Sequence, residues 1–124
     1  MTINEAIELV DELRPNQYTR DIKIAWLSTL DGRIYNEVFC THEGNQVASM
    51  PRYTEESGEV ELLIPYPYAE DIYNYFLQAM IDKENGEATR YNQSITMYNS
   101  AFRAFANAYN RTHMPLSAGS CFMI

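Results

Sequence analysis

The sequence predicts an all-α protein, a small helical bundle of about four helices whose last two form a long antiparallel hairpin. Three observations support this fold class. Apolar residues recur at helical spacing in four separate segments. Capping residues, prolines and glycines stand at the ends of those segments. The last segment also carries a heptad pattern, which is typical of helices that pack in pairs.

The size and composition are those of one folded unit. The chain has 124 residues, 46% hydrophobic and 21% charged, which predicts a single domain over residues 1–124. A net charge of -8 is the wrong sign for a protein that binds nucleic acid by neutralising phosphates. The apolar runs are too short to cross a bilayer, and no signal peptide precedes them, so we expect an intracellular protein without a membrane partner.

The first helix is predicted over about residues 3–14. Thr2 and Glu5 form a capping box, in which each side chain can bond the other residue's backbone amide. Pro15 ends the helix because it forces the preceding residue out of the helical region. The apolar face is expected to comprise Ile3, Ala6, Ile7, Val10 and Leu13.

The second helix is predicted over about residues 20–41, with Thr19 as its N-cap and Gly44 as its C-terminal cap. Asp31-Gly32 is also a turn signal, so a break at this point is the competing interpretation. We favour a continuous helix because the apolar stripe keeps its phase across the glycine. The stripe is expected to comprise Ile22, Trp26, Leu30, Ile34 and Val38, widened by Ala25 and Leu27.

An irregular arm is predicted over residues 45–61, where polar residues dominate and no period persists. Residues 59–62 alternate briefly and predict a short extended edge. Pro65 and Pro67 then fix an extended approach to the next helix. We expect the arm to be poorly ordered in an isolated subunit.

The third helix is predicted over about residues 68–84, ended by Asn85-Gly86, and the fourth over about residues 87–111. So short a turn predicts an antiparallel hairpin. The apolar positions of the fourth helix step alternately by three and four residues, which makes a heptad seam. They are Ala88, Tyr91, Ile95, Tyr98, Phe102, Phe105 and Tyr109.

A flexible C-terminal tail is predicted over residues 112–124, because small residues there lead to the apolar end Phe122, Met123 and Ile124. We expect this end to dock on a neighbour, with a disordered tail as the alternative. Tyr53, Tyr66 and Tyr68 lie in or beside irregular backbone, where burial is not required. Together with Phe122, Met123 and Ile124, these tyrosines are the six candidate interface residues.

The strongest candidate for chemistry is Cys40-Thr41-His42, which His113 and Cys121 would complete as a metal site. Structural zinc sites offer two closely spaced ligand pairs, which this spacing does not. A Cys40/His42 nucleophile would lack a third, orienting group. The sequence also has no Gly-rich phosphate loop, nucleophile elbow or His-Glu-x-x-His motif. We therefore predict a protein that is not an enzyme and has no cofactor.

Several segments resemble the head-tail connector adaptor (head-completion) proteins of tailed bacteriophages and of prophages in Gram-positive bacteria. The resemblance covers most of residues 2–38 and 59–115 and leaves out the polar arm and the last few residues. The segments that carry it are Trp26-Leu27-x-x-Leu30-Asp31-Gly32, Leu62-Leu63-Ile64-Pro65-Tyr66-Pro67-Tyr68, Ala79-Met80-Ile81-Asp82, Asn85-Gly86-Glu87 and Tyr109-Asn110-Arg111-Thr112-His113-Met114-Pro115.

The resemblance implies a structural virion protein that forms a ring under the portal, links capsid to tail and extends the DNA channel. Its partners would be the portal protein, a tail or stopper protein and copies of itself, with DNA passing only through an acidic lumen. It would occupy the virion neck, and the bacterial host cytoplasm during assembly. The competing hypothesis is a small acidic helical regulator or inhibitor that mimics DNA, or an enzyme that depends on Cys40 and His42.

Overall fold

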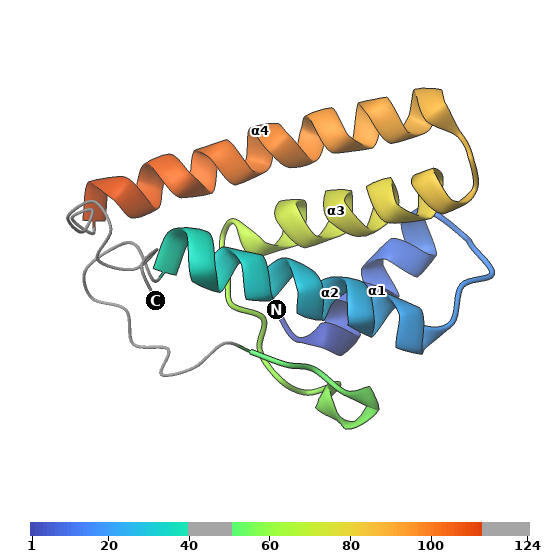
Figure 1. The fold of residues 1–124 in the computed structure, drawn as a ribbon, viewed down its shortest axis with the longest axis horizontal. Helices are drawn as coiled ribbons and strands as arrows, with labels where there is room; N and C mark the ends of the chain where they lie inside the picture. Colours follow the sequence, from blue (N-terminus) through green and yellow to red (C-terminus); the bar gives the residue numbers. More distant parts are fainter. Residues whose placement is uncertain (40–50, 113–124) are drawn as a thin grey trace.

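The structure, a computed structural model, describes residues 1–39 and 51–112. Within them it has four α-helices and no β-strand, so the all-α fold and the helical bundle are confirmed (Figure 1). The helices are α1 (Ile3–Leu13), α2 (Arg20–Ile34), α3 (Ala69–Glu84) and α4 (Ala88–Thr112). These boundaries lie within one residue of the predicted ones, except at the end of α2.

The second helix crosses Asp31-Gly32 without a break and continues as a π-helical segment, η1 (Tyr35–Phe39). The preference for a continuous helix is therefore confirmed as far as Phe39. The predicted end at residue 41 and the Gly44 cap lie outside the described residues. A short 3-10 helix, η2 (Glu55–Ser57), lies in the arm.

Helix α3 is the centre of the bundle. Figure 1 shows α4 along one side of it and α1 and α2 on the other. Ten of its 16 residues are buried, so it is enclosed on almost every side. This position makes α3 the element to which the other helices are attached.

The hairpin of α3 and α4 is present, and its turn is closed by Gly86, whose φ of 73° is readily available only to glycine. Ring contacts follow the predicted seam. The Tyr98 ring lies 5.6 Å from that of Phe76, and the buried Phe105 ring lies 5.8 Å from that of Tyr68. The antiparallel pairing is confirmed, and the heptad seam is confirmed except at Ala88, which is exposed.

The buried faces of the first two helices differ from the predicted stripes. Leu13 and Ile22 are 56% and 40% exposed, and Ala25 is exposed. The buried face of α2 instead includes Lys23 and Asp31, two charged residues that apolar spacing does not register. The apolar members of that buried face are Ile24, Leu27, Leu30 and Ile34.

The predicted extended edge is a single antiparallel bridge between Thr2 and Glu61. The Ile3 amide donates to the Val60 carbonyl at 3.1 Å, and the Leu62 amide donates to the Met1 carbonyl at 2.9 Å. The end of the arm therefore runs alongside the first residues of the chain.

Candidate functional site

The arm is held to the bundle by one buried carboxylate, that of Asp31. Asp31 accepts hydrogen bonds from the Tyr53 hydroxyl at 2.5 Å, the Tyr73 hydroxyl at 2.6 Å and the Leu63 amide at 3.0 Å. Its side chain therefore joins α2, α3, the beginning of the described part of the arm and the segment just after the arm. The expectation of a poorly ordered arm is wrong for residues 51–61, while residues 45–50 lie outside the described residues.

The three donors to Asp31 are neutral groups, and this determines the electrostatics of the carboxylate. Burial raises the pKa of Asp31, and the hydrogen bonds from Tyr53, Tyr73 and Leu63 partly oppose that rise. Burial, followed by the Asp31 charge, raises the pKa of Tyr73 and of Tyr53 well above the ordinary value. Both phenols therefore keep their protons and remain donors.

The arm is also fixed against α1 by a close backbone approach at Gly58. The Asn4 amide donates to the Gly58 carbonyl at 2.9 Å. A Cβ at Gly58 would lie 2.5 Å from the Arg20 guanidinium and 2.6 Å from the Asn4 side chain, so a larger residue would displace both. Asn4 Nδ2 in turn donates to Glu59 at 2.9 Å.

The candidate interface residues occupy different environments. Tyr66 is 84% exposed and presents nearly its whole side chain to solvent. Tyr68 is half-buried with its ring against Phe105, and Tyr53 is half-buried with its hydroxyl bound to Asp31. Both therefore serve the protomer's own packing. Phe122, Met123 and Ile124 lie outside the described residues.

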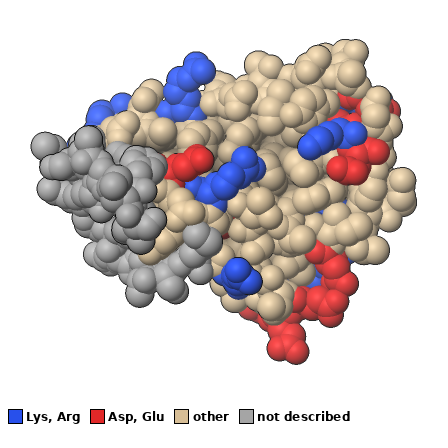
Figure 2. Space-filling view, in the orientation of Figure 1, with Lys and Arg blue, Asp and Glu red and all other residues tan. Residues whose placement is uncertain are grey.

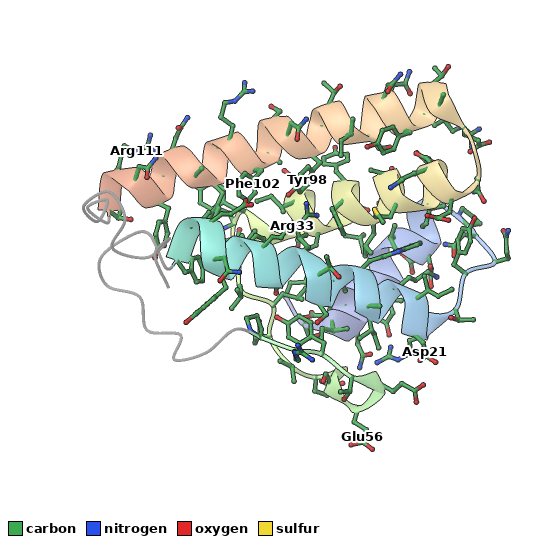
Figure 3. The ribbon with its side chains drawn as sticks, viewed as in Figure 1. Asp21, Arg33, Glu56, Tyr98, Phe102 and Arg111 are labelled. Carbon is green, nitrogen blue, oxygen red and sulfur yellow. The ribbon has the colours of Figure 1, made fainter. Side chains whose placement is uncertain are left out.

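Charge is distributed unevenly along the chain. All 17 acidic residues precede Ala88, whereas α4 contains three arginines and no carboxylate. Figure 2 shows a group of carboxylates at the lower right of the molecule, with others elsewhere on this face, and Figure 3 places Asp21 and Glu56 at the lower right and Arg111 at the upper left. A hydrogen bond to Asp21 and the charge of Asp21 raise the pKa of Glu55. Asp21, Glu55 and Glu56 form what we call the acidic tip.

The residues considered for catalysis or metal binding are not brought together in the described part. No group of three or more His, Cys, Asp or Glu residues within 1–39 and 51–112 could hold a metal ion. Cys40, His42, His113 and Cys121 all lie outside those ranges. Among the helices described, none combines the length and the apolar character needed to cross a membrane.

Comparison of the chain with protein-family models, with curated proteins and with solved structures found no match.

Sequence reasoning identified Asp31 only as half of a turn signal and missed its role as an anchor. The sequence contains one signal for this role, which is the position of Asp31 in the helical period. Asp31 lies four residues after Leu27 and three before Ile34, both of which are buried, so it lies on the same face of the helix. An acidic residue on the buried face of a helix requires partners. The partners themselves could not be identified, since Tyr73 is 42 residues away.

Proposed function

We propose that this protein is a head-tail connector adaptor, a structural component that forms a ring under the portal, links capsid to tail and extends the DNA channel. The resemblance over residues 2–38 and 59–115 is the first support. The structural observation that supports it best is that Asp31 fixes the arm at Tyr53 and the following segment at Leu63, close in sequence to the exposed Tyr66. A fixed base and an exposed aromatic residue suit a lasting contact between proteins.

Tyr66 has the properties of an interface anchor. Its ring is large and 84% exposed, and Pro65 and Pro67 restrain the backbone on either side. A restrained segment loses little conformational entropy when a partner covers it. The portal protein is the partner we assign to this residue.

The charge balance supports passage of DNA without retention. The chain carries 17 acidic and nine basic residues, and an excess of carboxylates repels phosphates. A channel component gains from this repulsion because DNA has to slide through it.

A second candidate function is a regulator that mimics DNA, and the acidic tip is the observation that favours it. Asp21 lies close enough to Glu55 to raise the pKa of that carboxyl, as neighbouring charges do in a row of phosphates. The partner would then be a basic nuclease or repressor. The absence of carboxylates from α4 excludes that helix from such a surface.

The test is light scattering after size exclusion, on the protein alone and with the portal protein encoded in the same phage or prophage region. We expect a stoichiometric complex with the portal. Tyr66→Ala should weaken that complex by about tenfold or more, as the loss of an aromatic anchor does. The matched control is Met97→Ala, which truncates a 48% exposed side chain on α4 and should leave binding unchanged.

If the protein stays monomeric and does not bind the portal protein, the proposal is overturned. Binding to a basic nuclease or repressor would then favour the second candidate. If Tyr66→Ala and Met97→Ala lose the same affinity for the portal protein, the proposed connector function stands and the assignment of Tyr66 as an interface anchor is overturned.

A further inference from the structure

An open cleft of about 600 Å³ lies between α2 and the beginning of the described arm. Arg33 contributes to it from α2, where Figure 3 labels it, and Arg52 contributes from the arm. Ser28, Asn36 and Thr54 add hydroxyl and amide groups, and no carboxylate lines the cleft. An acidic protein therefore has one cleft whose charged groups are both cationic.

The two arginines have no ion pair within the described residues. Three of the chain's nine cationic side chains, Arg14, Lys23 and Arg90, are paired with carboxylates there. Arg33 and Arg52 are exposed and share the cleft with each other. Within the described residues no ion pair compensates these two charges, and a bound anion would compensate them.

Neither of the carboxylates nearest in sequence to Arg33 lines the cleft. Asp31 is fully buried and accepts hydrogen bonds from Tyr53, Tyr73 and Leu63. Glu37, one turn beyond Arg33 on the same helix, is not among the residues that line the cleft.

We propose that this cleft binds a phosphate monoester as its dianion. Each guanidinium presents a planar fork of N–H donors that matches phosphate oxygens. A carboxylate has two oxygens and is satisfied by one fork, whereas a phosphate monoester has three terminal oxygens for two forks and the neighbouring hydroxyls. The volume lies within the range of about 300–1,000 Å³ typical of small-molecule sites, and so leaves room for the organic group of the ester.

The cleft is formed before any ligand arrives. The Tyr53 hydroxyl is bound to Asp31, and its amide donates to Ser28 Oγ at 3.2 Å. These bonds fix the arm side of the cleft to α2. Since the Ser28 hydroxyl accepts from that amide, its own proton is available to a ligand. A preformed site loses little entropy on binding. This inference does not depend on the proposed function.

The test is titration of the full chain with phenyl phosphate, inorganic phosphate and benzoate, followed by calorimetry and by amide NMR shifts. We expect one saturable site for phenyl phosphate, with shifts centred on Ser28, Tyr53 and Thr54. Benzoate should bind about tenfold more weakly or worse, because it satisfies one guanidinium. Arg33→Gln and Arg52→Gln should each weaken phenyl phosphate binding by about tenfold or more.

The matched control is Arg103→Gln, which removes the same charge from the exposed face of α4 and should leave the affinity unchanged. An equal loss in this control would overturn the site in favour of a general charge effect. If benzoate binds as tightly as phenyl phosphate, the choice of phosphate as the ligand is overturned. If a short duplex DNA binds more tightly than phenyl phosphate at equal phosphate concentration, the assignment of a monoester as the ligand is overturned. Absence of saturable phenyl phosphate binding would overturn the proposal outright, and that titration needs no variant.

Discussion

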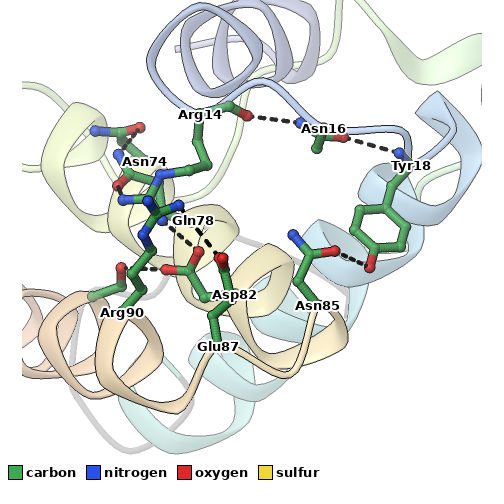
Figure 4. Close-up of polar contacts among 10 residues, drawn as sticks. Arg14, Asn16, Tyr18, Asn74, Gln78, Asp82, Asn85, Glu87 and Arg90 are labelled. Carbon is green, nitrogen blue, oxygen red and sulfur yellow. Dashed lines mark hydrogen bonds and ion pairs between the residues drawn. The ribbon is translucent and has the colours of Figure 1, made fainter.

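Two aspartates, Asp31 and Asp82, are both fully buried, and they are stabilised in different ways. Asp82 on α3 forms an ion pair with Arg14 and accepts a hydrogen bond from Ser94 Oγ at 2.9 Å (Figure 4). Among the described residues, the donors to Asp31 are neutral. The comparison shows two ways to offset the cost of burying a carboxylate, because either a cation or several hydrogen-bond donors can compensate it.

The two carboxylates also hold different parts of the molecule. Asp82 attaches the end of α1 and the second turn of α4 to the central helix, whereas Asp31 attaches the arm. Around Asp82 the polar network extends further, because Arg14 Nη2 donates to Gln78 Oε1 at 3.0 Å and Gln78 donates to Asn74 at 3.0 Å. We therefore expect damage at Asp82 to affect the bundle and damage at Asp31 to affect mainly the arm.

The largest effect is expected from Arg14→Met. Arg14 is 25% exposed while Asp82 is fully buried, so the substitution leaves the buried charge with Ser94 as its remaining donor. Breaking a buried pair on one side costs about 3–5 kcal/mol of unfolding free energy. Urea denaturation measures this loss.

The control for that prediction is the double variant Arg14→Met with Asp82→Leu, which removes both charges. It should recover a substantial part of the loss, because an apolar pair of similar volume can replace a buried ion pair. A loss below about 1 kcal/mol in the single variant would show that Asp82 does not depend on its cation.

A smaller effect is expected from Asp31→Asn. The asparagine oxygen can accept two hydrogen bonds where three donors converge, so one donor loses its partner at a cost of about 1–3 kcal/mol. Hydrogen exchange at the Leu63 amide should accelerate while exchange within α4 stays slow. Equal acceleration in both places would contradict the division between arm and bundle.

The smallest effect is a dependence on pH. Since the pKa of Asp31 is raised in the folded protein, its contribution to stability is present below the unfolded pKa of about 3.9 and is lost as pH rises through the folded value. The difference in unfolding free energy between the wild type and Asp31→Asn should therefore shift against the wild type as pH rises across this range.

Glu5 provides a control of opposite sign. Hydrogen bonds with the Thr2 amide and hydroxyl lower the pKa of Glu5. Its contribution is therefore present above the unfolded pKa of about 4.3 and is lost as pH falls. In thermal unfolding followed over pH, the Glu5→Gln and Asp31→Asn differences should move in opposite directions. Parallel changes would mean that the overall charge, and not these two environments, controls the response.

The helices were predictable because their signals are local. Thr2 and Glu5 form the expected capping box, with bonds of 3.2 and 2.8 Å, and Thr19 caps α2. The anchors were not predictable, because Arg14 and Asp82 are 68 residues apart and Asp31 and Tyr73 are 42 apart. Irregular backbone also indicated equal exposure for Tyr53 and Tyr66, and their difference arises only when the arm docks on Asp31. The Arg33/Arg52 cleft likewise arises only from that docking.

The two oxygens of Asp31 have different partners. Oδ1 accepts from the Tyr73 hydroxyl of α3, whereas Oδ2 accepts from the Tyr53 hydroxyl and the Leu63 amide of the segment that connects α2 to α3. We therefore expect a movement of α2 against α3 to reach both Tyr53 and Leu63 through this single side chain.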